Sequence, residues 1–330
     1  MPESATSDKC RRVGGLLMIW ATATTLGAVL PIWLAFQLAA PQPGLAALPK
    51  PDMQLRIIAD ERQLVRIVGR VSVERARDVF SLYGYELEAV REGDLVPPIF
   101  VRAMPRDIGE IIDTDLRKDV FAETVLPLIL MANAEIARDR RRLLALIEAG
   151  GGDLGALTMR DRRWLGKLAG RYGLEETDLA RLQRRVDIVP PSLAVAQAAK
   201  ESGWGTSRFA QDGNALFGQW VWNTEEGIEP EDPQATAQPY SVRQFPDISE
   251  SVRAYTHNLN THRAYHDFRA LRAAQRAEGG VPDGLRLAGT LLEYSQRREA
   301  YVEELQGMIR FNDYHTLDRA RLTTMANAGF

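Results

Sequence analysis

The sequence is poor in the side chains that form disulfides and bind transition metals. Among its 330 residues it has one cysteine, Cys10, and four histidines. A disulfide needs two cysteines, and a zinc site usually needs a cluster of cysteine and histidine ligands. The spacing of the histidines resembles no metal site that we can justify; they are His257, His262, His266 and His315. We therefore expect neither a metal nor another cofactor.

An excess of positive charge is also missing. The chain has 41 Lys and Arg against 44 Asp and Glu, a formal net charge of −3 and a pI of about 5.9. Domains that bind nucleic acid usually carry a basic surface, so the composition predicts no nucleic-acid partner. Internal repeats and low-complexity tracts are absent from the sequence. A hydrophobic content of 45% in a chain of this length suits one or two globular domains.

A long uncharged segment, residues 13–40, follows three basic residues near the N-terminus. About 20 apolar residues span a bilayer, and flanking positive charge marks the cytoplasmic side. We therefore predict a cytoplasmic tail over 1–12, a transmembrane anchor over 13–40, and the rest of the chain on the outer side of the membrane. The alternative is a cleaved signal peptide, but its apolar region usually has about 7–15 residues.

Two segments are predicted between the anchor and the main domain. Residues 41–52 are rich in proline and should form an extended spacer. Residues 53–96 are predicted to form a small accessory segment, in which short β-prone runs precede helical spacing over 73–83. A pair of prolines at 97–98 marks its end.

Residues 97–186 have the pattern of a helical scaffold. Apolar residues recur at helical spacing from about Asp115 to the glycines at 150–152, and Pro127 is expected to kink this helix. Thr158 and Asp161 form a capping-box signature ahead of another helix. Further helices are predicted after Asp247 and over 264–277, 284–294 and 299–311. The fold class is therefore mainly α.

One stretch places a single carboxylate at the end of a helix of small residues. Pro190 and Pro191 suit the start of a helix, and Ser192 can accept a hydrogen bond from a free donor of its first turn. Glycines at 203 and 205 end the helix. Glu201 therefore lies in the last turn.

Two features are expected to raise the pKa of Glu201. The carboxyl lies at the negative end of the helix dipole, which disfavours the ionised form. Trp204 follows within one turn, and an apolar indole beside a carboxyl acts in the same direction. A raised pKa suits a general acid. The alternative is a solvated glutamate at a helix end, which is the more common situation.

A short extended segment and a polar loop follow the helix. Residues 216–222 have the pattern of a strand, which would place Trp220 and Trp222 on one face. Two indoles there suit stacking on the apolar faces of sugar rings; the alternative is that both belong to the core. The loop over 223–239 carries five acidic residues, namely Glu225, Glu226, Glu229, Glu231 and Asp232.

Several of these motifs together resemble one enzyme family. Residues 186–210, VDIVPPSLAVAQAAKESGWGTSRFA, and 213–220, GNALFGQW, resemble the Bax-type glucosaminidases of bacteria, in glycoside hydrolase family 73. The resemblance continues at 245–255, FPDISESVRAY, at 258–262, NLNTH, and at 294–302, YSQRREAYV. It is weaker back to Pro97 and does not cover residues 1–96.

The resemblance implies a lysozyme-like α fold with a small β-hairpin lobe over residues 97–330, with a catalytic core over 187–312. It implies an endo-β-N-acetylglucosaminidase that hydrolyses the β-1,4 bond after N-acetylglucosamine in peptidoglycan. The family's catalytic glutamate matches Glu201, and its catalytic tyrosine matches Tyr294. In the family a second catalytic carboxylate comes from this variable loop. Glu226 aligns with it, and the other four acids of the loop remain alternative candidates. Residues expected to contact substrate are Trp204, Phe217, Gln219, Trp220, Trp222 and Tyr301.

This hypothesis leaves two routes and two competing functions. After Glu201 protonates the glycosidic oxygen, either a loop carboxylate activates water and configuration inverts, or the substrate's acetamido group attacks and configuration is retained. The competing functions are a lytic transglycosylase of the same fold and a non-catalytic scaffold that binds peptidoglycan. With the anchor, the resemblance predicts a single-pass protein of the bacterial inner membrane whose catalytic domain faces the periplasm or wall. The sequence does not indicate a protein partner.

Overall fold

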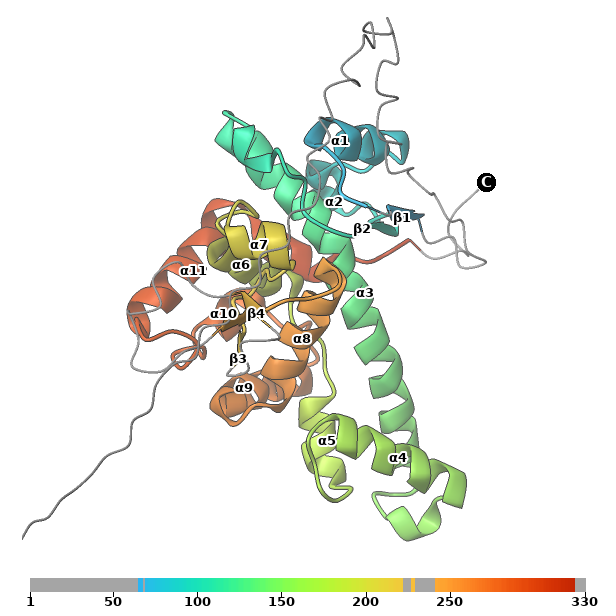
Figure 1. The fold of residues 1–330 in the computed structure, drawn as a ribbon. Helices are drawn as coiled ribbons and strands as arrows, with labels where there is room; N and C mark the ends of the chain where they lie inside the picture. The colour runs from blue at the N-terminus through green and yellow to red at the C-terminus, as the bar shows by residue number, and fades with distance from the viewer. Residues whose placement is uncertain (1–64, 68, 222–226, 229–240, 324–330) are drawn as a thin grey trace, which may run out of the picture. The chain divides into compact units, whose positions relative to one another are not determined.

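We describe the chain from a computed structural model, which covers residues 65–67, 69–221, 227–228 and 241–323 (Figure 1). The predicted tail, anchor and spacer lie outside these residues, as do Trp222 and the five loop acids. All the described residues belong to one compact unit, residues 51–330. This unit is built mainly of α-helices with short strands, which confirms the predicted fold class.

Helices provide most of the described secondary structure. The α-helices are α1 Val73–Leu82, α2 Leu87–Glu92, α3 Thr114–Ala149, α4 Met159–Arg171, α5 Leu179–Arg185, α6 Pro191–Ser202, α7 Arg208–Gly213, α8 Ile248–Thr261, α9 His266–Ala277, α10 Gly284–Ala288 and α11 Glu299–Phe311. The 3-10 helices are η1 Ile108–Glu110, η2 Leu154–Ala156, η5 Arg263–Tyr265 and η6 Tyr314–Arg319. The strands are β1 Val65–Ile67, β2 Ile99–Val101, β3 Trp220–Val221, β4 Gly227–Ile228 and β5 Ser241–Arg243.

The predicted long helix is α3, which connects the two ends of the described unit (Figure 1). Asp113 caps its N-terminus by accepting hydrogen bonds from the backbone N–H groups of Asp115 and Leu116. The helix continues on both sides of Pro127. Among the described helices, α3 alone is long and apolar enough to cross a membrane, but 67% of its most apolar window is buried inside the protein. That burial is typical of the central helix of a globular domain.

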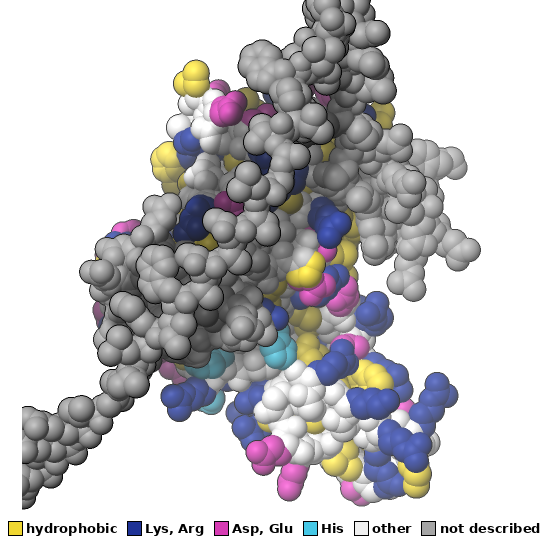
Figure 2. All heavy atoms as spheres, viewed as in Figure 1, with side chains coloured by type: hydrophobic (Ala, Val, Ile, Leu, Met, Phe, Trp, Pro, Cys, Tyr) yellow, Lys and Arg dark blue, Asp and Glu magenta, His cyan; other side chains and the backbone are white. Residues whose placement is uncertain are grey.

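The C-terminal half of α3, α4 and α5 form a lobe with a hydrophobic cluster of its own, which includes Leu143, Leu165 and Leu182. Thr158 caps α4, and its Oγ1 both accepts from the Asp161 N–H and donates to the Asp161 carboxylate. The predicted cap at Thr158 is therefore confirmed, although Asp161 accepts from the Thr158 hydroxyl and not from its backbone N–H. Figure 2 shows Lys and Arg side chains gathered over this lobe, a local concentration that the net charge of the chain does not reveal.

The helix of small residues is α6, and its predicted bounds are confirmed. It begins at Pro191 and ends at Gly203, which has a left-handed φ of 58°. Every residue from Pro191 to Ala199 is buried, because α3, α10, α11 and η6 surround the helix. Small side chains let these neighbours approach closely: a Cβ on Gly284 of α10 would lie 2.1 Å from Ser192 Oγ.

The cap of α6 differs from the prediction. Among the described residues, no N–H of the first turn donates to Ser192 Oγ. The carboxylate of Asp318, in η6, accepts from the Ser192 N–H at 2.9 Å and from the Gly284 N–H at 2.8 Å. A carboxylate brought from 126 residues away therefore satisfies the first turn of the helix.

The segment leading into α6 is held by a buried ion cluster. Asp187 is 2% exposed, and its carboxylate lies 2.9 Å from Arg276 and 3.5 Å from Arg140. Its carbonyl oxygen accepts from Arg272 and from Asn260. These contacts link α3, α8 and α9 to the start of α6 and fix its position.

Two small sheets complete the described unit. In the first, β1 pairs parallel with β2. Val101 was expected to begin a loop, but it is the last residue of β2. In the second, β5 lies between β3 and β4 and pairs antiparallel with both, which gives the predicted β lobe. The strand expected over 216–222 is shorter, because residues 216–217 form a turn.

The part of the accessory segment that the structure describes does not form a separate core. Val79, Phe80, Leu87 and Val90 of α1 and α2 belong to the same buried cluster as α3 and α6. The predicted division at residue 96 therefore does not correspond to a break in packing. Near the C-terminus, helix 264–277 is found as α9 and helix 299–311 as α11, whereas the helix expected over 284–294 ends at Ala288.

Candidate active site

Glu201 lies where α6 reaches the surface of the described unit. The helix is buried on all sides up to Ala199, and Glu201 is the second residue of α6 after that point. Its side chain is half-buried. The carboxyl is therefore held by the packed end of a core helix and still accessible from one side.

A chain of hydrogen bonds fixes one oxygen of this carboxyl. Tyr301 Oη donates to Glu201 Oε1 at 2.9 Å. Gln197 Nε2 donates to Tyr301 Oη at 2.9 Å, and Tyr255 Oη donates to Gln197 Oε1 at 2.6 Å. Tyr301, Gln197 and Tyr255 are each at most 2% exposed.

The hydrogen bonds of this network run in one direction, from Tyr255 through Gln197 and Tyr301 to Glu201. Because the Gln197 amide nitrogen donates to Tyr301 Oη, the hydroxyl proton of Tyr301 is free to point at Glu201. Tyr255 in turn uses its proton on the amide oxygen, which sets the orientation of the Gln197 amide. Buried networks of this kind, with every member satisfied, hold a single arrangement.

Burial raises the pKa of Glu201 above its usual range, as expected from the sequence. The hydrogen bond from Tyr301 and the charge of Lys200 act in the opposite direction, and burial outweighs them. Lys200 is itself paired with Glu304. The Trp204 ring lies edge-on to Phe121, with 5.8 Å between ring centroids.

Trp204 is half-buried and its backbone has a φ of +59°. A bulky residue in the left-handed region is strained and persists where the surrounding structure imposes it. Here the glycines on both sides also have positive φ, and a Cβ on Gly205 would lie 2.8 Å from Met104 Cε. The turn after α6 is therefore packed tightly against the core, with the indole at its edge.

The second oxygen of Glu201 faces the loop after α7. A Cβ placed on Gly218 would lie 3.9 Å from Glu201 Oε2, and Gly218 has a φ of +57°. A glycine here keeps the backbone close to the carboxyl without placing a side chain over it. Among the described hydrogen bonds, none engages Oε2.

Tyr294, the predicted catalytic tyrosine, stands next to Tyr301. Their rings stack with 5.5 Å between centroids and 13° between planes, and the centroid of the Tyr265 ring lies 6.0 Å from that of Tyr294. Tyr294 Oη donates to the carbonyl oxygen of Phe217 at 3.4 Å. The structure therefore brings Tyr294, Tyr301 and Glu201 together with the 217–218 loop.

The residues expected to contact substrate fall into three groups. Phe217 and Tyr301 are 3% and 2% exposed, and the Phe217 ring stacks on Tyr255 at 3.9 Å, so we revise their role from sugar contact to support of the site. Trp204 and Gln219 are half-buried, and their contact with substrate stays a prediction. For Trp220 only the backbone is described, and Trp222 and Glu226 lie outside the described residues.

Gln197 and Tyr255 were not predicted to belong to the site. A signal existed for Gln197, because it lies four residues before Glu201 and therefore on the same face of the helix. A glutamine among alanines on a buried helix needs polar partners. Tyr255 gives no comparable signal, since its contact with Gln197 joins residues 58 apart in the sequence.

Comparisons with known proteins show which family contains this site. Residues 177–314 match the family model Glucosaminidase, described as mannosyl-glycoprotein endo-beta-N-acetylglucosaminidase. Protein bax of Escherichia coli (strain K12) is 34% identical over 205 residues, which cover 59% of this chain and 70% of that protein. The chain belongs to the glucosaminidase family.

Membership of the glucosaminidase family makes the chain a glycosidase. The matched range contains Glu201, Tyr294, Tyr301 and both residues that complete the hydrogen-bond chain. Among solved structures, the catalytic domain of the autolysin Auto from Listeria monocytogenes matches at 16% identity and a TM-score of 0.30, over 54% of this chain and 86% of that one. That likeness is too low to bear on function.

Proposed function

We propose that this glucosaminidase is a membrane-anchored peptidoglycan hydrolase that cleaves the β-1,4 bond after N-acetylglucosamine, with Glu201 as its general acid. One observation carries the proposal: a half-buried carboxyl with a raised pKa accepts a hydrogen bond through one oxygen, and its other oxygen faces Gly218, which has no side chain. A general acid needs both a retained proton and a fixed direction of delivery.

The two oxygens of Glu201 have different tasks. Oε1 accepts the hydrogen bond from Tyr301, so the acidic proton resides on Oε2. Oε2 faces Gly218, and a glycosidic oxygen placed there receives the proton as its bond to the anomeric carbon breaks. The carboxylate that results keeps the Tyr301 hydrogen bond, which stabilises the negative charge after transfer.

The opposite face of the sugar is completed in one of two ways. A carboxylate of the 223–239 loop activates water, which requires carboxyl groups about 6.5–9.5 Å apart and inverts configuration. Otherwise the substrate's acetamido oxygen attacks the anomeric carbon, with Tyr294 and a carboxylate orienting it, and configuration is retained. Proton NMR of the first-formed anomer during digestion of a soluble glycan distinguishes the two.

Digestion of purified sacculi tests the proposal. Wild type should release fragments with reducing N-acetylglucosamine ends, identified by mass spectrometry, and Glu201→Gln should release none while keeping its melting temperature. Glu303→Gln, an exposed glutamate on α11, is the matched control and should retain activity. Anhydromuramic ends would identify a lytic transglycosylase instead. Binding of sacculi without release of any fragment would identify a scaffold.

The anchor is a separate part of the proposal, supported by the uncharged length of residues 13–40 and the basic residues before it. It places residues 41–330 outside the inner membrane, facing the wall. In spheroplasts, added protease should degrade the chain and leave a short membrane-bound fragment. A chain that stays in the soluble fraction after cell breakage would contradict the anchor.

A further inference from the structure

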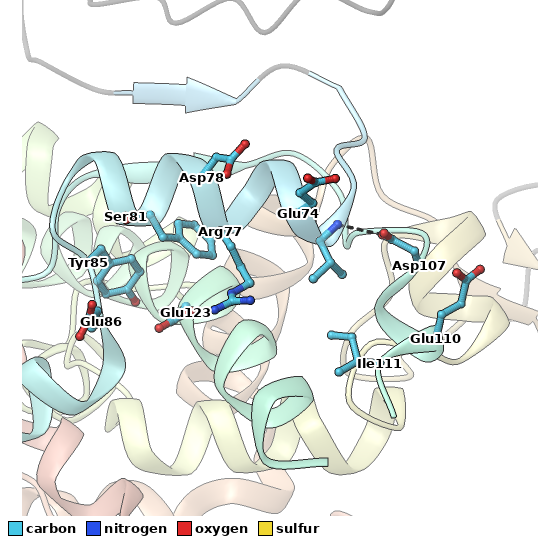
Figure 3. A pocket seen from close by; sticks show the side chains of 12 residues that line it. Glu74, Arg77, Asp78, Ser81, Tyr85, Glu86, Asp107, Glu110, Ile111 and Glu123 are labelled. Atoms are coloured by element: carbon cyan, nitrogen blue, oxygen red, sulfur yellow. Dashed lines mark hydrogen bonds between the residues drawn. The ribbon is translucent and has the colours of Figure 1, made fainter. Parts of the chain in front are cut away.

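An open cleft lies between α1, η1 and the first half of α3, in the part of the chain before the matched family range. Its volume is about 710 Å³. Figure 3 shows Arg77 beside Glu123 and Tyr85 at one end of it, with Asp107 and Glu110 at the other end. The wall formed by η1 packs on the segment that follows Glu201, since a Cβ on Gly109 would lie 3.6 Å from Thr206 Cγ2.

The cleft is strongly negative. Six carboxylates line it against one arginine, Arg77; they are Glu74, Asp78, Glu86, Asp107, Glu110 and Glu123. Three of the six already have a partner: Asp107 accepts from the Val73 N–H at 2.9 Å (Figure 3), Glu123 accepts from the Leu87 N–H, and Asp78 lies 3.7 Å from Arg75. Among the described residues, no carboxylate lies within ion-pair distance of Arg77, but its charge acts to lower the pKa of Glu123, so Arg77 offsets part of the negative charge at that end. This balance favours a cationic ligand that also offers a group to the arginine.

Tyr85 supplies a second observation, independent of the charge. Its side chain is 2% exposed and its ring packs edge-on against Phe80, with 5.4 Å between centroids. Its hydroxyl is buried without a hydrogen-bond partner among the described residues. A buried hydroxyl without a partner is costly, and natural structures rarely keep one without a reason. The hydroxyl lies at the cleft, on the side of Glu123 (Figure 3).

Glu123 stands close to that hydroxyl. Its carboxylate accepts from the Leu87 N–H at 3.1 Å, which fixes its position at the floor of the cleft. The charge of Glu123 contributes to the raised pKa of Tyr85, which agrees with their proximity. A donor placed between them would reach two acceptors, the hydroxyl oxygen and the carboxylate.

The arrangement suits an ammonium group better than a metal ion. Among the described residues, no group of three or more Asp, Glu, His or Cys side chains converges as metal ligands would. An ammonium group carries three N–H donors and can satisfy acceptors that are spread apart. Arg77 is then available to a carboxylate of the same ligand, for which its planar donors are well suited.

We propose that this cleft binds a short peptide, with a free ammonium group between Tyr85 and Glu123 and a carboxylate on Arg77. On the function proposed above, on which this identification rests, the ligand is the peptide that branches from the wall glycan. Such peptides contain a diamino acid whose side-chain amine is free until it is cross-linked. The cleft therefore distinguishes a peptide with a free side-chain amine from a cross-linked one, while Glu201 acts on the glycan.

Calorimetry on the full chain in detergent micelles tests the proposal with two synthetic peptides. One is N-acetyl-Ala-Glu-Lys-Ala with a free lysine amine and C-terminal carboxylate, and the other is the same peptide with the lysine amine acetylated. The free amine should bind at least about tenfold more tightly, since a hydrogen-bonded charge is lost on acetylation. Equal affinities, or no binding of either peptide, would overturn the proposal.

Variants separate binding from folding. Tyr85→Phe removes a hydroxyl that has no partner in the protein, so it should keep or raise the melting temperature and yet weaken binding of the free-amine peptide about fivefold or more. Glu123→Gln should weaken it similarly, and Glu92→Gln, an exposed glutamate on α2 outside the cleft, should not. If Tyr85→Phe binds the free-amine peptide with the wild-type affinity, Tyr85 does not contact the ammonium group and the proposal is wrong.

The outcome is independent of catalysis. The same titration with Glu201→Gln should give the wild-type affinity. If sacculi are not cut but the peptide binds, the proposed function fails and the cleft stands. If sacculi are cut and neither peptide binds, the cleft fails and the proposed function stands.

Discussion

Tyr301 Oη donates a hydrogen bond to Glu201 Oε1 at 2.9 Å, although the two residues are 100 apart in the sequence. The tyrosine belongs to α11 and the glutamate to α6, so the packing of these two helices sets the position of the acid. The same hydrogen bond also moderates the effect of burial on the Glu201 pKa, because it favours the ionised form.

Tyr301→Phe should change both the rate and its pH dependence. Without the hydrogen bond the pKa of Glu201 rises further, so the general acid keeps its proton to higher pH and the alkaline limb of the rate profile moves upward. The carboxyl also loses its fixed orientation, and the rate at the optimum should fall about tenfold.

Rates of sacculus digestion between pH 4 and pH 9 measure both effects. Tyr314→Phe is the matched control, because Tyr314 is also buried and its hydroxyl has no partner among the described residues. It should leave the profile unchanged. An unmoved alkaline limb in Tyr301→Phe would contradict the assigned role of Glu201.

Gln197→Glu should reverse the direction of the hydrogen-bond chain. Burial at position 197 would raise the pKa of the new carboxyl, and above that pKa the carboxylate only accepts, so Tyr301 would turn its proton to residue 197 and release Glu201. The added negative charge also raises the pKa of Glu201. We expect a loss of at least about tenfold in rate. Gln306→Glu adds the same charge on α11, where Gln306 donates to the Leu285 carbonyl, and should keep activity. Equal rates in the two variants would show that residue 197 does not orient Tyr301.

The bounds of α6 could be predicted because the signals are local. Pro190 and Pro191 fix its start, and Gly203 adopts the left-handed conformation that ends it. The cap at Thr158 is local for the same reason. Helix ends of this kind depend on a few neighbouring residues, which a sequence displays directly.

The contacts that complete the site could not be predicted, because they join distant residues. Asp318 replaces the cap expected from Ser192, and Tyr255 reaches Gln197 from another helix. Single-sequence patterns report spacing along one element and not which elements meet. For that reason Phe217 and Tyr301, which are aromatic and close to the motifs, were expected to contact sugar rather than to be buried.

Gly284→Ala should destabilise the protein. The new Cβ would lie 2.1 Å from Ser192 Oγ and 3.0 Å from the Leu193 nitrogen, so α10 must move away from α6. Overpacking of this kind typically costs about 1–3 kcal/mol. Gly307 is a matched control, since it is exposed within α11 and a Cβ there meets nothing within 4 Å. Gly307→Ala should stabilise by about 0.5–1 kcal/mol. Urea denaturation of both variants measures the difference, and a neutral Gly284→Ala would contradict the close contact between these helices.

Glu123→Gln should change how stability depends on pH. Burial raises the pKa of Glu123 to about 7, from 4.5 for an unperturbed glutamate. Between these values the folded chain binds a proton that the unfolded chain has released. The stabilisation is therefore complete below about pH 4.5 and is lost as the pH rises through about 7. Glutamine stays neutral and keeps an acceptor for the Leu87 N–H.

Wild type and Glu123→Gln should therefore melt at similar temperatures near pH 4.5, and the variant should melt several degrees higher at pH 8. Differential scanning fluorimetry across this range measures the difference between the two proteins. Asp318, whose pKa burial raises to about 6, titrates in both and cancels from that difference. Glu92→Gln should show no such pH dependence. Parallel curves for wild type and Glu123→Gln would mean that Glu123 is not buried as described, because a solvated carboxyl has the same pKa in the folded and unfolded chain.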